Sequence, residues 1–340
     1  MSTTPKPVTI LTGFLGAGKT TFLNHLIEKN ATTRYAIIEN EFGEQGIDSE
    51  LILRPDDTIV ELNNGCLCCT LNDNLYDILN ELFDRKDEFD EIILEATGVA
   101  DPTGLAEPFV SHPLIKEFFP LRGIICLVDS EQVEQHIANT EEAIKQITFS
   151  DVLLLNKSDL TSKEHLEVLT EKMQRLNPLA QIVPGNKNNF PNIDLVKQNN
   201  QLEELFAKKH KLHEKEEKKE TSFPVKKPHA HHHHEHTEEV NSQSFIFDQP
   251  FDYAALDRQF FAYLTLQARD LYRMKGLVWV EGSEEQYLIQ SVGTRLDFEK
   301  KRAWETAEKK QSVLVFIGKN LQREALEQLL NNCLVQKTSI

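Results

Sequence analysis

The chain has 340 residues, of which 40% are hydrophobic and 27% charged, and its formal net charge is −17. This length and composition are typical of a globular protein with two domains. The negative charge argues against a nucleic-acid partner, which calls for a basic face. The longest apolar runs, such as IICLV and VLVFI, are far shorter than the roughly 20 residues of a membrane span.

The sequence also lacks the marks of export. Its start, MSTTPKPVTILTG, has no basic segment followed by an apolar one, so we expect no secretory signal. Five cysteines, three of them clustered, fit a reducing compartment in which thiols stay free for metal or redox chemistry. We therefore expect a cytoplasmic protein without a membrane partner.

Residues 1–205 alternate short apolar runs with helical patterns. The runs are apolar nearly throughout, as expected of strands buried on both faces of a parallel sheet, and comprise residues 8–11, 35–39, 91–95, 123–129 and 151–156. Residues 19–30 and 74–85 instead carry apolar side chains at helical spacing. This order predicts a mainly parallel α/β sheet with helices on both faces.

The rest of the chain divides into two parts. Residues 206–241 are rich in Lys, Glu and His with little to bury, which predicts a disordered linker. Residues 242–340 read as a strand, a helix, a pair of strands, a further strand and a closing helix. We interpret them as a small α+β domain with a ferredoxin-like βαββαβ order.

The segment GFLGAGKTT follows the first predicted strand and opens a predicted helix, in the pattern G-x-x-x-x-G-K-[ST]. Such a P-loop wraps backbone N–H groups around phosphates. Lys19 adds positive charge and serves catalysis, and Thr20 offers a hydroxyl to Mg²⁺. We predict a mainly parallel P-loop NTPase domain whose phosphate-binding residues are Gly13, Gly16, Ala17, Gly18, Lys19, Thr20 and Thr21.

The segment LLLNKSDL supplies an independent sign of the nucleotide. It places Asn156, Lys157 and Asp159 after a buried strand, where the loops of an α/β sheet bind ligands. The Asp159 carboxylate can accept hydrogen bonds from guanine N1–H and its exocyclic amine, a donor pair that adenine lacks. The pattern therefore favours GTP over ATP.

Two acidic segments follow the P-loop. In EIILEATGVADP, Glu95 ends a buried strand at the Walker B position and is expected to hold Mg²⁺ in the catalytic site, although a structural strand-end charge is the alternative. Gly98 can donate its N–H to the γ-phosphate and report hydrolysis. In IENEFGEQGID, Asp48 is the second candidate magnesium carboxylate. The neighbouring Glu39, Glu41 and Glu44 are either solvated charges or weak metal-ligand candidates.

Three thiols stand close together in NNGCLCC, at Cys66, Cys68 and Cys69. Thiolates are soft ligands that suit Zn²⁺ or Co²⁺, and three of them leave one tetrahedral position open for metal exchange. His112 is a weaker candidate for the fourth ligand. A redox-active thiol pair and a cysteine-lined core are the alternatives. Cys126 lies in an apolar run and reads as a packed side chain.

Histidines concentrate in the predicted linker, where eight of the twelve lie between His210 and His236. A mobile run of imidazoles binds Zn²⁺ or Co²⁺ by multivalency, whereas a passive polar spacer is the alternative. The auxiliary metal ligands that this hypothesis names are His229, His231, His232, His233, His234 and His236.

The segments GFLGAGKTT, NEFGEQGID, NNGCLCC, EATGVADP and NKSD, in this order, resemble those of the CobW-like GTPases. The resemblance covers nearly the whole chain, because YRMKG and its surroundings are similar to the C-terminal domain of that family. It implies a GTP-hydrolysing metallochaperone that carries a transition metal at the C-x-C-C motif to a client metalloprotein. Zinc is the favoured metal, and cobalt for cobalamin synthesis is the alternative.

Other functions stay open at this stage. A GTP-gated metal buffer or regulator would bind metal without delivering it. A GTPase of translation is disfavoured by the net charge, and a thiol oxidoreductase lacks a cofactor site. No residue is identified as positioning the attacking water. We therefore expect slow intrinsic hydrolysis, with a client or a nucleotide- or metal-dependent homodimer completing the site.

Overall fold

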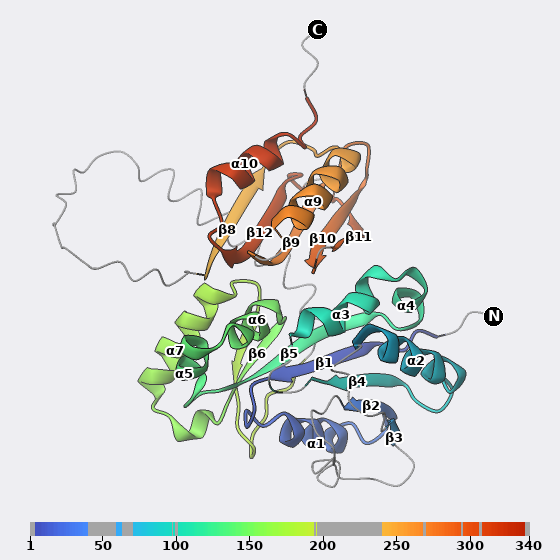
Figure 1. Ribbon diagram of the computed structural model, residues 1–340, viewed down its shortest axis with the longest axis vertical. Helices are drawn as coiled ribbons and strands as arrows, with labels where there is room; N and C mark the ends of the chain where they lie inside the picture. The colour runs from blue at the N-terminus through green and yellow to red at the C-terminus, as the bar shows by residue number, and fades with distance from the viewer. Residues whose placement is uncertain are drawn as a thin grey trace, which may run out of the picture.

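The computed structural model describes residues 4–39, 59–62, 71–96, 98, 101–193, 195, 240–267, 270–293, 295–305 and 308–336. Several predicted site residues lie outside these ranges: Glu41, Glu44 and Asp48, the cysteines Cys66, Cys68 and Cys69, and the histidines His229, His231, His232, His233, His234 and His236. The same is true of residues 206–239 of the predicted linker. The described residues form two sheets with their helices (Figure 1).

The first sheet has seven strands, all parallel to their neighbours, in the order β3-β2-β4-β1-β5-β6-β7. Their bounds are β1 Val8–Gly13, β2 Tyr35–Glu39, β3 Ile59–Leu62, β4 Glu91–Glu95, β5 Leu121–Asp129, β6 Val152–Asn156 and β7 Gln181–Pro184. The predicted parallel α/β class is confirmed. The sequence patterns did not reveal the short edge strands β3 and β7.

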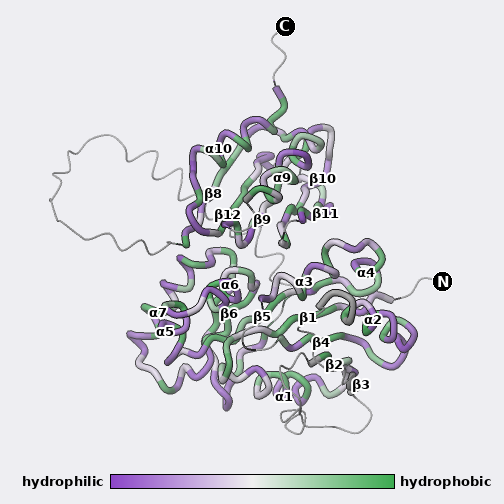
Figure 2. The backbone as a smooth tube through the Cα atoms, in the orientation of Figure 1, coloured by the Kyte–Doolittle hydropathy of each residue, from purple (hydrophilic) through white to green (hydrophobic). Residues whose placement is uncertain are grey.

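Helices cover both faces of this sheet (Figure 1). Their bounds are α1 Lys19–Lys29, α2 Leu71–Asp84, α3 Pro102–Ser111, α4 Pro113–Phe118, α5 Val133–Asn139, α6 Glu141–Phe149 and α7 Lys163–Leu176. Strand β1 shows why both faces need a cover, because Val8 and Ile10 pack in the core with α2 and α3 while Leu11 packs with α1. The central strands are accordingly hydrophobic along their length (Figure 2).

The second sheet is antiparallel and five-stranded, in the order β11-β10-β9-β12-β8. Its elements are β8 Val240–Phe247, α9 Tyr253–Gln267, β9 Leu271–Trp279, β10 Glu285–Val292, β11 Arg295–Ala303, β12 Ser312–Lys319 and α10 Arg323–Asn331. Along β12, Leu314 and Phe316 pack with the helices, whereas Val313 and Val315 belong to a separate core that includes Leu179 of the first domain. One face of the sheet therefore packs toward the first domain.

The order of elements in the second domain differs from the expected βαββαβ. The structure has βαββββα, because residues 295–303 form β11 and the second helix comes only after β12. Strand β11 pairs with β10 through a tight hairpin at Gly293, whose φ is 58°. Leu296 and Phe298, two residues apart on β11, pack on the core side, but the charged residues around them hid this alternation.

The described helices offer no candidate for a membrane-spanning segment, because none is long and apolar enough. The two domains meet in two places. Side chains of α6 and of Asp151, just before β6, contact β9 and β12, and Glu107 and Lys116 of α3 and α4 form ion pairs with β11. These contacts place the second sheet directly against elements that lead to the candidate site.

Candidate nucleotide-binding site

The candidate site lies where parallel strands of the first sheet end. Strand β1 lies between β4 and β5, so the P-loop that follows β1 emerges beside the end of β4 and close to the loop after β6. Ligands of open α/β sheets bind at this carboxyl edge. The topology thus brings the P-loop, Glu95 and the loop from Asn156 to one edge, as the motifs predict.

The P-loop backbone depends on glycine. Gly13, Gly16 and Gly18 all have positive φ, and Gly18 immediately precedes α1 with a φ of 96°. A Cβ atom at Gly18 would stand 2.4 Å from the Asn156 Nδ2. Any larger residue there would therefore be strained and would displace the loop that follows β6.

Lys19 is held over the P-loop at the start of α1. Its Nζ donates to the Gly13 carbonyl at 3.1 Å and to the Phe14 carbonyl at 3.5 Å, and the residue is 8% exposed. The first N–H groups of α1 have no partners within the helix, and the helix dipole makes this end attractive to anions. The loop is therefore shaped for a phosphate group.

Thr20 and Glu95 meet across the edge of the sheet. The Thr20 hydroxyl donates to the Glu95 Oε1 at 3.4 Å. A hydroxyl and a carboxylate in contact beside a phosphate loop form the kind of oxygen donor set that Mg²⁺ takes. The backbone of Glu39 pairs with that of Glu95 in the register of β2 and β4, so this weaker candidate stands at the same edge.

Gly98 approaches the P-loop closely. A Cβ atom at Gly98 would stand 2.6 Å from the Leu15 backbone nitrogen, so only glycine fits between this turn and the loop. The Gly98 carbonyl accepts a hydrogen bond from the Gln146 Nε2 at 3.2 Å. The residue expected to face the γ-phosphate is thus packed on the P-loop on one side and held by α6 on the other.

The loop after β6 is tied to the P-loop. The buried Asn156 donates from Nδ2 to the Ala17 carbonyl at 2.7 Å. Lys157, at a φ of 58°, forms an ion pair of 2.7 Å with the buried carboxylate of Asp129. Asp159, in the short helix Ser158–Leu160, is exposed, so its carboxylate is accessible to a base.

Asp129 and Gln146 are structural partners of this site that the motifs did not reveal. Asp129 ends β5 and is 2% exposed, so its burial must be offset by the Lys157 ammonium. An acid directly after the apolar run IICLV is a signal that sequence reasoning could have used. Gln146 lies in an amphipathic helix, and nothing in its spacing marks it out.

Cys126 and Cys333 are packed side chains. Burial raises the pKa of the Cys126 thiol to about 12 and that of the Cys333 thiol to about 11. A thiol that stays protonated is a poor metal ligand. The interpretation of Cys126 as a small buried residue is confirmed.

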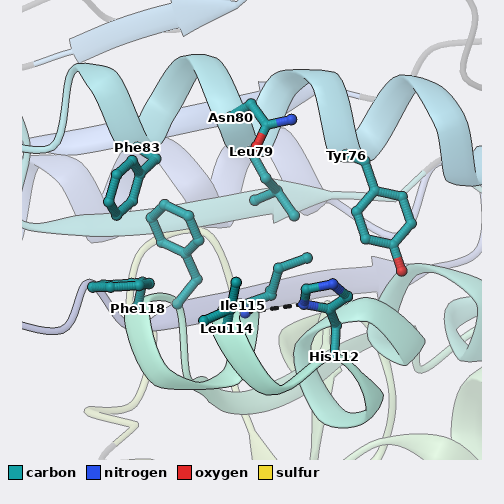
Figure 3. A pocket seen from close by; sticks show the side chains of 9 residues that line it. Tyr76, Leu79, Asn80, Phe83, His112, Leu114, Ile115 and Phe118 are labelled. Atoms are coloured by element: carbon teal, nitrogen blue, oxygen red, sulfur yellow. Dashed lines mark hydrogen bonds between the residues drawn. The ribbon is translucent and has the colours of Figure 1, made fainter.

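His112 separates α3 from α4 and caps α4. Its Nδ1 accepts the Ile115 N–H at 3.4 Å, and its ring packs edge-on against Tyr76 of α2. His112 lines an apolar groove of about 350 Å³. Figure 3 shows His112 at one end of it and Phe83 and Phe118 at the other. Within the described ranges, no three His, Cys, Asp or Glu side chains gather as a metal site, so the role of His112 as a ligand stays a prediction.

The carboxyl edge of the first sheet has the organisation of a P-loop GTPase. The family model "CobW/HypB/UreG, nucleotide-binding domain" matches residues 7–184, and the model "Cobalamin synthesis protein cobW C-terminal domain" matches residues 240–334. The chain belongs to the CobW/HypB/UreG family.

The similar proteins include two curated relatives and one solved structure. The zinc chaperone YjiA of Escherichia coli (strain K12) is 32% identical over 95% of this chain and 96% of its own. The zinc-regulated GTPase metalloprotein activator 1 of Schizosaccharomyces pombe is 38% identical over 53% of this chain and 45% of its own. The crystal structure of Zn(II)-bound YjiA from E. coli covers 98% of this chain and 100% of that chain, at 28% identity and a TM-score of 0.65.

Proposed function

We propose that this protein is a GTP-hydrolysing zinc chaperone, which binds Zn²⁺ at its three clustered cysteines and transfers it to a client metalloprotein in step with the nucleotide. The observation that carries the proposal is the contact between Thr20 and Glu95 beside the P-loop, in a chain that matches zinc chaperone YjiA over 95% of its length. Because YjiA is a zinc chaperone that aligns with this chain along nearly its whole length, the similarity supports zinc as the metal that this protein carries.

GTP binding rests on residues from three loops. Lys19 and the N–H groups at the start of α1 hold the phosphates, and Gly98 donates to the γ-phosphate. Asp159 accepts from the guanine base, while Asn156 and Lys157 keep its loop against the P-loop and Asp129. Because adenine lacks the N1–H and amine donor pair, ATP is expected to bind far more weakly.

Mg²⁺ is held by Thr20 and Glu95, with Asp48 as the third predicted group. The two described side chains are 3.4 Å apart, oxygen to oxygen, and both offer the hard ligands that this ion prefers. When bound, Mg²⁺ neutralises charge on the phosphates of the nucleotide. Lys19 supplies the fixed positive charge from the protein itself.

Zn²⁺ is the cargo, and its proposed ligands are Cys66, Cys68 and Cys69. These cysteines belong to the connection between β3, which ends at Leu62, and α2, which begins at Leu71. Leu62 pairs with Ile38 in parallel register, so the chain leaves β3 at the same edge of the sheet as Glu95. This topology supports coupling between the thiols and the nucleotide. Glu39, His112 and the linker histidines are weaker, auxiliary candidates.

A zinc titration with different nucleotides tests the proposal. Zn²⁺ is added to the reduced protein with a non-hydrolysable GTP analogue, with GDP or with ATP, and the free metal is followed with a chromophoric chelator. We expect one tight site that the Cys66→Ser/Cys68→Ser/Cys69→Ser variant loses. We also expect the zinc affinity of the protein bound to the GTP analogue to differ at least about tenfold from that of the GDP-bound protein, which is within the range of ordinary allosteric coupling. ATP should behave like no nucleotide.

The matched control is Cys126→Ala, which removes a buried thiol from the core of the sheet and should leave zinc binding intact. Release of zinc to the chelator on addition of GTP, but not of the analogue, separates a chaperone from a GTP-gated metal buffer. Equal zinc affinities in all nucleotide states would overturn the coupling, and zinc binding that survives in the triple serine variant would overturn the site. Repeating the titration with Co²⁺ decides between the two candidate metals.

A further inference from the structure

Helix α6 carries a buried glutamine into the candidate site. Gln146 is 1% exposed, and its Nε2 donates to the Gly98 carbonyl at 3.2 Å. Gly98 has no side chain and so little intrinsic restraint on its backbone. The Gln146 amide on one side and the Leu15 backbone on the other leave that peptide little room to move.

The first turn of α6 is held by the C-terminal domain. Glu141 accepts a hydrogen bond from the Tyr272 hydroxyl at 3.1 Å, and its other oxygen lies 3.3 Å from the Lys319 Nζ. Tyr272 belongs to β9 and Lys319 to β12. An acid in the first turn of a helix is favoured by the helix dipole, so Glu141 is a natural anchor.

The end of α6 is held by the same domain. Arg273 of β9 donates from Nη1 to the carbonyls of Phe149 and Ser150, the latter at 2.8 Å. Its Nη2 forms an ion pair with Asp151, the residue just before β6. The last carbonyls of a helix have no partners within the helix, and a cation there is favoured by the dipole. Both ends of α6 are thus fixed by the second sheet.

We propose that Gln146 is a positioning residue for GTP, which orients Gly98 toward the γ-phosphate, and that the C-terminal domain sets its position by holding α6 at both ends. The inference rests on the proposed GTP-dependent function and adds a residue and a domain to it. Because binding linkage is reciprocal, a change of the C-terminal domain alters the preference for GTP over GDP, and GTP alters the C-terminal domain in turn.

The first test removes the amide. Gln146→Met keeps the length and approximate volume of the side chain but has no N–H donor. We expect the affinity for a non-hydrolysable GTP analogue to fall about tenfold, which is what one lost hydrogen bond in a buried site amounts to. GDP affinity should stay within about twofold, because GDP has no γ-phosphate for Gly98 to contact, and kcat should fall by a similar factor to the analogue affinity.

Two variants control this result. Glu142→Gln changes an exposed residue of the same helix and should alter neither affinity. Gln146→Asn keeps the amide and shortens its reach by one methylene, so an intermediate loss is expected. Retained GDP binding shows that each variant is folded.

The second test acts from the C-terminal domain. Tyr272→Phe combined with Lys319→Gln removes the two partners that the C-terminal domain offers Glu141 and leaves its ion pair with Lys145 of the first domain in place. We expect the preference for the GTP analogue over GDP to fall about threefold to tenfold. The control is Tyr263→Phe, which likewise removes a tyrosine hydroxyl, but from a residue of α9 that packs against the core of the second domain.

The outcomes separate the two levels of the proposal. If the wild-type protein does not bind GTP more tightly than ATP, the proposed function fails. If it does, but Gln146→Met keeps the full preference for the GTP analogue over GDP, the positioning role of Gln146 is wrong. If Gln146→Met loses the preference while the Tyr272 and Lys319 double variant keeps it, the part assigned to the C-terminal domain is wrong.

Discussion

The two sheets of this protein place their polar and charged side chains differently. The parallel sheet is buried on both faces, so its polar groups gather where strands end, at Lys19, Glu95 and Asn156. The antiparallel sheet has one face under α9 and α10 and turns the other toward the first domain. Its charged side chains Arg273 and Lys275 lie within a strand, yet both reach Asp151 of the first domain.

This difference shows which contacts a motif can reveal. At the ends of parallel strands the chain must turn, so short segments with glycine and charged residues stand out from the apolar runs around them. In the second sheet, by contrast, Arg273 is separated by 122 positions from its partner Asp151 in the first domain. Candidate binding residues are therefore recognisable from the sequence in the first domain, whereas the contacts between the domains are recognisable only in the folded structure.

The nucleotide site should show the largest effect of any single change. Lys19→Ala removes the positive charge that the P-loop carbonyls of Gly13 and Phe14 hold in place. We expect kcat/KM for GTP hydrolysis to fall about 100- to 1000-fold, the usual loss when a preorganised group that stabilises transition-state charge is removed. Phosphate release measured over a range of GTP concentrations gives this value.

The control for this change is Lys29→Ala, which removes an exposed lysine from the last turn of the same helix. Hydrolysis by that variant should match the wild type. Equal activity of Lys19→Ala and Lys29→Ala would mean that Lys19 of the P-loop does not contribute to GTP hydrolysis. The ends of the parallel strands would then not be the site of catalysis.

Much of the first domain could be predicted because local patterns and the fold agree there. The five apolar runs form the five central strands, and GFLGAGKTT spans the end of β1, the turn after it and the start of α1. The same reasoning missed β3 and β7, which are four residues long and lie at the two edges of the sheet. An edge strand needs only one hydrogen-bonded neighbour, so its sequence carries a weaker pattern.

The partners of the site were harder to predict. The burial of Asp129 beside Lys157 depends on two strands that meet only in the folded sheet, although the acid at the end of IICLV is visible. Gln146 reaches Gly98 from 48 positions away. In the second domain, β11 was hidden because charged residues surround its two core-side residues. These features depend on tertiary packing, which overrides local preference.

The buried charges between the domains should have the next largest effect. Arg273 is 6% exposed at its side chain and pairs with Asp151, and it also donates to the end of α6. We expect Arg273→Ala to lower the free energy of unfolding by about 3 kcal/mol, since removing one partner leaves the largely buried Asp151 carboxylate, 17% exposed at its side chain, with weaker compensation. Lys275, 3.4 Å from Asp151, prevents a larger loss.

Chemical denaturation followed by two probes measures this effect. Both tryptophans, Trp279 and Trp304, belong to the C-terminal domain, so their fluorescence reports that domain, while circular dichroism reports both. Arg175→Ala is the control, because its ion pair with Glu171 is exposed and should contribute nothing measurable. A loss no greater than that of the control would show that the domains are held by apolar packing rather than by these charges.

The smallest predicted effect is a dependence of stability on acid pH. Burial alone would raise the pKa of Asp151, but the charges of Arg273 and Lys275 and the Ile124 N–H outweigh it and hold that pKa at about 2, below the ordinary value of 3.8. A carboxyl whose pKa is lower in the folded state stabilises the fold above the unfolded-state pKa, and that contribution disappears as the pH falls through the folded-state value. The contribution is about 2 kcal/mol above pH ~5, and about half of it is lost by pH ~3.

Unfolding at pH 5, 4 and 3 of the wild type and of Asp151→Asn isolates this contribution. The advantage of the wild type over the variant should shrink by about 1 kcal/mol across this range, because the variant has no carboxyl to protonate. Asp87→Asn, at an exposed position before β4, should follow the wild type throughout. If the difference in free energy of unfolding between wild type and Asp151→Asn stays constant over this range, the pKa of Asp151 is not lowered in the folded protein. The charges of Arg273 and Lys275 would then not stabilise the Asp151 carboxylate between the two sheets.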